Sequence, residues 1–504
     1  MMRRPEEIVL TGCNIPTVHS ADTLVLRDGR IAAVGGAEIL PDGAEVRTLD
    51  LDGMTVLPGF VDAHTHFVAV GLREMGWETD LVGLSRDETL DRLADAARRG
   101  DDALWVIARG WDESMWQDRR YLERDELDRL APNRPLIAAR VDMHMLVANS
   151  AAMARIPPSV PREKVDAPRG LVREEAASEV LRGLEPPDEV LCEGLEASSR
   201  LANRLGITSI HAMLPAHQLP AHLRMRGRIR TRMTLCPEMP ALDAMISLGI
   251  RSGFGDAWVR FGGLKIFADG SIGAGNAAVA EPYVDTGGHG ALNHSDETLG
   301  AWVARAEEAG LQTVIHAIGD VAIEQVLAAH AKVGTSPELR HRIEHYELAT
   351  PEQIARTAEL GIAVSMQPNF VGDWSGEGKL YVDRLGEERD RRIDPHRSIL
   401  DAGVHLAFGS DCMPISPLYG IHAAVNAPHP VQRVSVAEAV ECYTEGGAYL
   451  SFEEGSKGRI EAGMLADLVV LDDDPLRVPE RIRDLNVEMT FVGGEPVYES
   501  RRVA

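Results

Sequence analysis

The sequence contains few lysines and few cysteines for its length of 504 residues. Lysine occurs at only five positions, so arginine supplies nearly all of the 52 basic residues. The five cysteines are scattered and never form a CxxC pair, which argues against a disulfide framework and favours a reducing compartment. The N-terminus also lacks the apolar core of a secretion signal. We therefore expect a cytoplasmic protein.

Long hydrophobic runs and excess positive charge are missing as well. No apolar stretch approaches the length of a membrane-spanning helix, and a mean hydropathy of -0.13 fits a soluble globular enzyme. The net charge of -26 argues against nucleic acid and anionic membranes as partners. We expect a small-molecule substrate instead, and the sequence leaves a homodimer open. The acidic, lysine-poor surface suits a high-salt cytoplasm or follows from GC-rich codon usage.

Short apolar strands alternate regularly with helical patterns from residue 206 onward. Together with the strand that starts at Thr55, they make eight β units, which predicts an α/β fold of the TIM type, a (β/α)₈ barrel. The alternative is a doubly wound sheet, but no GxGxxG follows the first strand. The predicted later strands are 207–211, 229–235, 261–267, 312–316, 342–345, 362–367 and 405–411, and the clearest helices are 188–205, 297–309, 322–332 and 351–360.

Both ends of the chain have β-type patterning and flank the barrel. Asp28-Gly29 between two apolar runs predicts a tight hairpin. We expect residues 1–57 and 447–504 to pack as one composite β-sandwich, and residues 58–446 to form the barrel. An insertion at about 68–200 interrupts the barrel after its first strand.

The first barrel strand runs into an HxH motif. In the stretch TVLPGFVDAHTHF, which starts at Thr55, His64 and His66 are two residues apart. Side chains alternate in an extended strand, so the two imidazoles share a face and form a pair of metal ligands. Two solvated loop histidines are the alternative, and the ligand-type residues that recur at later strand ends weigh against it.

Those later residues are charged or titratable groups inside apolar runs, where unpaired charges are rare. Lys265 stands out because this chain otherwise uses arginine, and only a buried lysine can react as a neutral amine. The C-terminal ends of barrel strands form the active site. The candidate set is therefore His64, His66, Lys265, His316, His345 and Asp411. His211 ends the second strand, and we expect it to support the site from the core.

The sequence resembles the amidohydrolase superfamily of metal-dependent hydrolases, and within it the amidohydrolase-3, YtcJ-like branch, which includes N-substituted formamide deformylases. The resemblance extends over nearly the whole chain. It rests on motifs in the family's order, which are PGFVDAHTH, GLKIFADGSIGAGNA, VIHAIGD, RIEHYEL, SMQPNF, FGSDCMP and KGRIEAGMLADLVVLDDDP.

The resemblance implies a role for each candidate. His64 and His66 would bind one metal, His316 and His345 a second, and Lys265, carboxylated by CO₂, would bridge them. Asp411 would bind the first metal and take the proton from the attacking water. Zn²⁺ is the expected metal, as one or two ions, with Mn²⁺ or Fe²⁺ as alternatives. The implied reaction is hydrolysis of an amide, formamide or N-acyl C–N bond.

Four further residues are candidates for binding the substrate. Trp111, Asp112 and His144 match positions that the branch has in its insertion, and Asp269 follows Lys265 in a loop that we expect over the pocket. Ordinary loop packing is the alternative for Trp111, Asp112 and His144. Two other functions stay open, namely deamination of a cyclic amidine or purine-like ring, and a non-catalytic binding protein on the same barrel.

Overall fold

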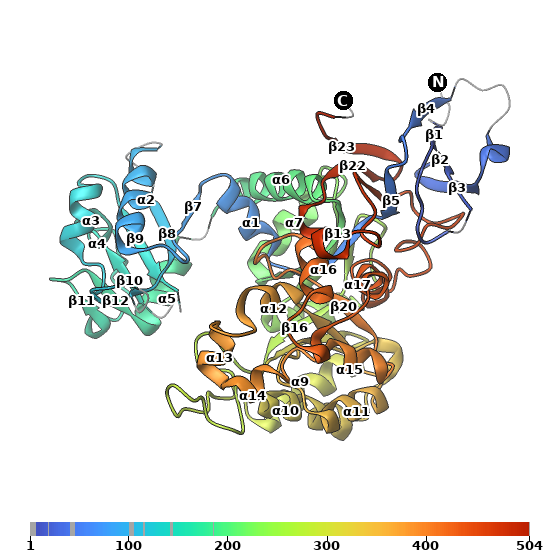
Figure 1. The fold of residues 1–504 in the computed structure, drawn as a ribbon. Helices are drawn as coiled ribbons and strands as arrows, with labels where there is room; N and C mark the ends of the chain where they lie inside the picture. The colour runs from blue at the N-terminus through green and yellow to red at the C-terminus, as the bar shows by residue number, and fades with distance from the viewer. Residues whose placement is uncertain are drawn as a thin grey trace. The chain divides into compact units, whose positions relative to one another are not determined.

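The protein is described here by a computed structural model that covers residues 7–18, 20–40, 46–99, 105–113, 116–141, 145–184 and 186–502. The chain divides into two compact units, one of Met1–Phe67 with Ser199–Ala504 and one of Val68–Ser198. Figure 1 shows the elements of both units along the chain. Among the described residues, every helix is too short or too polar to cross a membrane.

The first unit contains the parallel strands of a TIM-barrel-like α/β fold. They form two sheets, with the strand orders β15-β14-β13-β6 and β16-β17-β18-β19-β20. A parallel bridge between Glu238 and Lys265 connects the sheets on one side. On the other side, the backbone N–H of Asp411 donates to the His64 carbonyl at 2.8 Å. The strands are β6 (Phe60–Thr65), β13 (Ile207–Leu214), β14 (Arg232–Pro237), β15 (Val259–Phe261), β16 (Gly263–Phe267), β17 (Gln312–Ala317), β18 (Arg342–His345), β19 (Ala363–Met366) and β20 (Leu406–Phe408).

Helices follow most of these strands, and local signals set their ends. Helix α9 starts after Ser295, whose side chain accepts from the Thr298 N–H, and it ends at Gly310 in left-handed backbone. The helices are α6 (Asp188–Arg204), α7 (Leu219–Arg224), α8 (Leu242–Ser247), α9 (Asp296–Ala309), α10 (Asp320–Val333), α11 (Pro351–Glu359), α12 (Pro368–Trp374), α13 (Leu380–Leu385), α14 (Glu387–Asp390), α15 (His396–Asp401), α16 (Pro417–Val425), α17 (Val436–Cys442) and α18 (Glu445–Leu450).

Several predicted strands have different bounds in the structure. The predicted strand 261–267 is two strands, β15 and β16, and β13 continues three residues past its predicted end at His211, to Leu214. β14 starts at Arg232, three residues after the predicted start at Ile229. β20 ends at Phe408, whereas the sequence predicted a strand that continues to Asp411. The backbone turns into the left-handed region at Asp411, which a strand cannot include. The apolar pattern therefore located these strands but not their ends.

The two ends of the chain form two four-stranded sheets, with the orders β3-β2-β1-β4 and β23-β22-β21-β5. Strand β5 precedes the barrel and pairs with β21 from the far end of the chain. Asp28 and Gly29 both have positive φ, as the predicted hairpin between β2 and β3 requires. The strands are β1 (Ile8–Thr11), β2 (Thr23–Arg27), β3 (Arg30–Gly35), β4 (Arg47–Asp50), β5 (Thr55–Pro58), β21 (Leu468–Leu471), β22 (Val487–Val492) and β23 (Glu495–Glu499).

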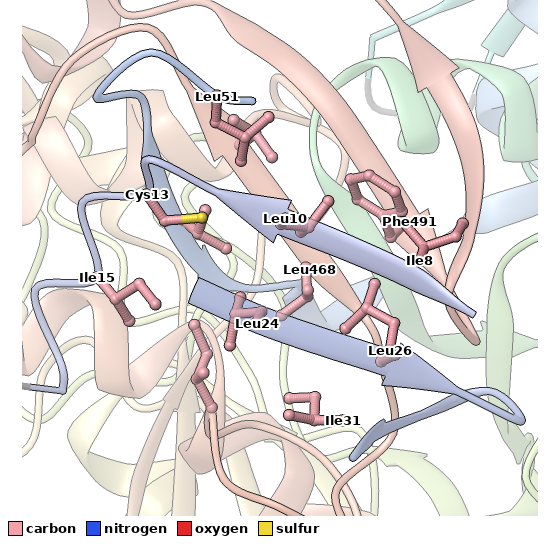
Figure 2. Close-up of a cluster of buried hydrophobic side chains, with 14 of the residues drawn as sticks. Ile8, Leu10, Cys13, Ile15, Leu24, Leu26, Ile31, Leu51, Leu468 and Phe491 are labelled. Atoms are coloured by element: carbon pink, nitrogen blue, oxygen red, sulfur yellow. The ribbon is translucent and has the colours of Figure 1, made fainter. Parts of the chain in front are cut away.

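Both terminal sheets contribute side chains to one hydrophobic cluster (Figure 2). Leu10 and Leu24 from the N-terminal strands and Leu468 and Phe491 from the C-terminal strands are all fully buried in it. Burial of apolar surface stabilises the folded state by about 25 cal/mol per Å². The two ends of the chain therefore depend on each other for their core.

The second unit contains one mixed sheet with the order β11-β12-β10-β9-β8-β7. Strands β7, β8 and β9 are parallel, and the others are antiparallel. Alternate residues of its central strands belong to two different hydrophobic clusters, one on each face of the sheet. Its elements are α1 (Phe67–Glu74), which starts at the unit boundary, β7 (Glu78–Asp80), α2 (Arg86–Arg98), β8 (Val106–Trp111), α3 (Arg124–Leu130), β9 (Leu136–Arg140), β10 (Met145–Ala148), α4 (Ser150–Met153), β11 (Val165–Asp166), β12 (Leu171–Arg173) and α5 (Glu174–Arg182).

Candidate metal centre and active site

Two histidines at the end of β6 lie next to the aspartate that follows β20. The Nε2 atom of His64 lies 3.8 Å from Oδ1 of Asp411, and Nε2 of His66 lies 3.4 Å from the same oxygen. His64 is fully buried, whereas 42% of the His66 side chain is exposed. The HxH pair therefore extends from the buried interior to the open side of the site.

Two histidines from β17 and β18 complete a continuous group of rings. The centroid of the His345 ring lies 4.8 Å from that of His64 and 4.4 Å from that of His316. His345 has a φ of 71°, in the left-handed region that a bulky side chain rarely adopts. Such a conformation persists only where the surrounding structure holds it, and it concentrates at functional sites.

The tightest group of potential ligands in the described part of the chain combines three strand ends. One ligand atom each from His64, His345 and Asp411 lies within 4.8 Å of the other two. This trio takes one histidine from each of the two predicted pairs. The division of the ligands between a first and a second ion therefore stays a prediction.

Lys265 of β16 is buried, with 1% of its surface exposed. Its Nζ has no hydrogen-bond partner among the residues that the structure describes, and it lies 4.8 Å from the centre of the Phe267 ring. Burial lowers the pKa of this amine, although the nearby Glu344 and Asp411 oppose the shift. An unsatisfied buried amine is costly, so Lys265 points to a group that the described residues do not supply.

The buried histidines are held in the neutral form. Burial lowers the pKa of His316 to about 3, and it lowers the pKa values of His64 and His345 well below the usual range. The charge of Lys265 adds to the shift at all three. Neutral imidazole is the form that binds metals, so these side chains are ready to act as ligands at neutral pH.

The segment after β20 is fixed against β6 by backbone contacts. The buried carboxylate of Asp62 accepts from the Ser410 N–H at 2.8 Å and from the His64 N–H at 3.3 Å. Gly409 packs so tightly that a Cβ there would lie 2.8 Å from the His64 Cβ. These contacts set the position of Asp411 relative to His64.

Asp269 organises the loop between β16 and α9. Its carboxylate accepts from the backbone N–H groups of Ala278, Ile318 and Gly319 at 2.9–3.0 Å. Its Oδ1 also lies 3.5 Å from Nε2 of His316. With 2% of its surface exposed, Asp269 connects this loop to the end of β17. A direct contact with substrate, as predicted for Asp269, stays a prediction.

The remaining predicted substrate-binding residues belong to the second unit. Trp111 is fully buried in a hydrophobic cluster of that unit, and its Nε1–H donates to the Ala138 carbonyl at 2.9 Å. Asp112 lies 3.4 Å from the guanidinium of Arg140. His144 lies outside the described residues. These contacts give Trp111 and Asp112 packing roles, and their part in substrate binding stays a prediction.

The sequence reasoning missed two charged residues that are central to the site. Glu344 accepts from Nδ1 of His64 at 2.5 Å, and its other oxygen lies 2.8 Å from Nε of Arg342. Both residues are fully buried. The sequence contained a signal for them. Arg342 and Glu344 are charged residues in a short predicted strand, where, as for Lys265, a charge is rare unless it is paired.

The comparison with known proteins decides the family. The model of the amidohydrolase family matches residues 47–498. The chain belongs to the amidohydrolase family. The predicted resemblance is therefore confirmed across most of the sequence.

Individual relatives extend over nearly the full length of this amidohydrolase. The putative amidohydrolase YtcJ of Bacillus subtilis is 31% identical, over 95% of this chain and 96% of that protein. The N-substituted formamide deformylase of Arthrobacter pascens is 29% identical, over 99% of both chains. The crystal structure of an uncharacterized metal-dependent hydrolase from Pyrococcus furiosus superposes with a TM-score of 0.79 at 30% identity, and covers 93% of this chain and 100% of that one. The family is one of hydrolases, and the Pyrococcus furiosus relative is a metal-dependent one.

Proposed function

We propose that this amidohydrolase uses a bound metal and water to hydrolyse a C–N bond in a small molecule. The proposed bond is an amide, formamide or N-acyl bond. The proposal depends chiefly on the convergence of His64, His345 and Asp411, whose ligand atoms lie within 4.8 Å of one another. The likeness to an N-substituted formamide deformylase, at 29% identity, supports the choice of bond.

The side chains present fit a divalent cation. Imidazole nitrogens together with carboxylate oxygen suit Zn²⁺, with Mn²⁺ and Fe²⁺ as alternatives. The buried Nδ1 of His345 and Nζ of Lys265 have no hydrogen-bond partner among the described residues. Ligation to His345 and carboxylation of Lys265 would give both side chains polar partners. This fit supports one or two ions.

We assign His64, His66 and Asp411 to one ion, His316 and His345 to a second, and a carboxylated Lys265 to the position between them. The neutral amine of Lys265 would add to CO₂, forming a C–N bond and releasing one proton to water. The product carries one negative charge, which suits a position between two cations. Burial favours this reaction because it lowers the pKa of the amine.

Asp411 is the residue that moves the proton. A bound divalent cation would polarise the scissile carbonyl and lower the pKa of water toward ~7. The Asp411 carboxylate accepts the proton of the attacking water and then delivers it to the leaving nitrogen. Its backbone N–H donates to the His64 carbonyl at 2.8 Å, which holds the main chain of Asp411 against the end of β6.

Two other functions have weaker support. A deaminase acting on a cyclic amidine or purine-like ring is less favoured, because deaminases of this superfamily usually lack the lysine that this chain has at position 265. A non-catalytic binding protein would not need the complete set of donors. The complete set therefore favours the hydrolase of amide-type bonds.

The finer architecture and the cellular setting are part of the proposal. We propose that the parallel strands close into a (β/α)₈ barrel of residues 58–446, with an insertion at about 68–200. The core that the terminal sheets share supports a composite β-sandwich of residues 1–57 and 447–504. A small-molecule substrate, a cytoplasmic location and the absence of nucleic-acid or membrane partners fit the acidic composition. A homodimer is compatible with it.

Metal analysis and a substrate screen test this function. The full chain, purified without chelator, should contain at least one equivalent of a transition metal, and His345→Ala should lose metal and activity together. A suitable control is His405→Ala, which removes an exposed histidine stacked on Tyr449 before β20. Activity is then measured on N-formyl, N-acyl and cyclic amide libraries with added Zn²⁺ or Mn²⁺. Native protein with less than about a tenth of an equivalent of any metal would contradict the proposal.

A further inference from the structure

A buried chain of polar side chains crosses the barrel interior, starting at His64. The Nδ1 atom of His64 lies 2.5 Å from Oε2 of Glu344, and Oε1 of Glu344 lies 2.8 Å from Nε of Arg342. A terminal nitrogen of Arg342 lies 2.8 Å from Nδ1 of His211. The four side chains come from β6, β18 and β13, and each has at most 1% of its surface exposed.

The direction of each hydrogen bond follows from the chemistry of the partners. A carboxylate only accepts, so Nδ1 of His64 carries the hydrogen that it donates to Glu344. The Nε2 atom of His64 then keeps its lone pair, and it faces Asp411 at 3.8 Å. Arginine only donates, so Nδ1 of His211 is the acceptor for Arg342. Glu344 is therefore approached by N–H groups of His64 and Arg342 from two sides, and Arg342 also donates to His211.

Stability alone does not explain a buried ion pair in this position. Removing two charges from water costs several kcal/mol per ion, and well-packed apolar residues of similar volume are often as stable. Glu344 and Arg342 lie two residues apart on β18, and both are fully buried. The ion pair can instead fix the orientation of the side chains that contact it. One of these side chains is His64, which contacts Glu344.

We propose that Glu344 and Arg342 are positioning residues that hold His64 in the tautomer with its hydrogen on Nδ1, so that Nε2 is presented to the metal. Arg342 fixes the Glu344 carboxylate, and His211 fixes Arg342. The negative charge of Glu344 also makes the His64 ring more basic, so that Nε2 would bind a metal more strongly. Carboxylates that contact metal-binding histidines commonly have this effect. The inference rests on the proposed metal-dependent function where it concerns Zn²⁺ affinity, whereas the tautomer of His64 can be measured without metal.

The first test is Zn²⁺ affinity. The full chain is stripped with chelator, and Zn²⁺ alone is titrated in competition with a chromophoric chelator. Glu344→Gln should weaken binding about 10–100-fold, because the neutral amide cannot both accept from His64 and form an ion pair with Arg342. The matched control is Glu347→Gln, which changes an equally buried carboxyl that accepts from Tyr381 at 2.6 Å. The control should bind Zn²⁺ within about threefold of wild type.

A second variant and a second readout keep the test decisive. If Glu344→Gln does not fold, Glu344→Asp retains the charge but withdraws the carboxylate, and the same weakening is expected. The tautomer is read directly from the ¹⁵N shifts of the metal-free, histidine-labelled protein, in which the His64 signals are assigned by their loss in His64→Gln. Hydrogen on Nδ1 in wild type, lost in the variant, supports the inference.

The outcomes separate the inference from the proposed function. Hydrogen on Nε2 of His64 in the wild type would overturn the inference whether or not the protein binds metal. Wild-type Zn²⁺ affinity in a folded Glu344→Gln would also overturn it while leaving the metal-dependent function intact. A wild-type protein that binds no Zn²⁺ but has the predicted tautomer would refute the metal-dependent function and retain the orientation of His64.

Discussion

Gly409 is the position where the packing of the site can be tested with one added carbon. A Cβ at this position would lie 2.4 Å from the backbone N, 2.8 Å from Cβ and 3.0 Å from Cα of His64. Non-bonded carbon atoms prefer a separation of about 3.5–4.0 Å, so one of the two segments must move by about 1 Å. The obstacle is mainly backbone, and a rotation of a side chain cannot relieve it.

The expected effect of Gly409→Ala is larger on function than on stability. Overpacking costs about 1–3 kcal/mol, and the loss of chain freedom in the unfolded state returns about 0.4–1 kcal/mol. The displaced partner is His64, however, and a shift of about 1 Å in a catalytic group can reduce the rate about 100-fold. We expect metal content and kcat/KM to fall well before the fold is lost.

The assay combines three measurements on each variant, namely thermal unfolding, metal content and kcat/KM on the best substrate from the screen. The control is Gly300→Ala in helix α9, where an added Cβ would meet no atom within 4 Å. Alanine favours a helix over glycine by about 1 kcal/mol, so this variant should be at least as stable as wild type with unchanged metal content. Native metal content and rate in Gly409→Ala would refute the argument that Gly409 sets the position of His64.

Three further predictions follow from the same geometry. Asp411→Asn retains the shape of the proposed proton carrier but not its basicity, and its rate should fall about 10²–10⁴-fold, with metal content measured alongside; a mutant with native metal and rate would remove Asp411 from the proposed mechanism. Lys265→Ala should lose part of its metal and recover activity with an added short carboxylic acid, whereas unchanged metal content and no recovery would indicate an unmodified lysine. A chain ended after Gly455 lacks β21, which pairs with β5, and should aggregate through exposed strand edges; a soluble, active truncation would contradict the shared core.

The sequence was sufficient to predict which strand ends approach one another. His64 and Asp411 are far apart in the chain, yet parallel strands bring their C-terminal ends to one place, and the two side chains lie 3.8 Å apart. The same rule placed His316 next to His345. Alternation also placed His64 and His66 together, since both lie near Asp411. These predictions needed only strand direction and period.

The sequence was not sufficient to predict how individual side chains turn at the strand ends. Strict alternation sends Glu344 and His345 to opposite faces of β18. In the structure Glu344 contacts His64 through a hydrogen bond, while the His345 ring lies 4.8 Å from the same residue. The left-handed backbone at His345, with a φ of 71°, makes this arrangement accessible. Such a φ is disfavoured for histidine, so no propensity rule predicts it.

The same departure occurs after β20, two strands away in the same sheet. Asp411 and Cys412 follow β20 with φ values of 47° and 63°, and Cys412 accepts from the His66 N–H at 3.2 Å. Regular strands would spread these side chains over two faces of the sheet. Left-handed residues at the ends of β18 and β20 instead bring His345 and Asp411 to His64. Each such conformation costs about 1–3 kcal/mol and persists only where the surrounding structure holds it, so the geometry of this centre depends on the packing around the ends of β18 and β20.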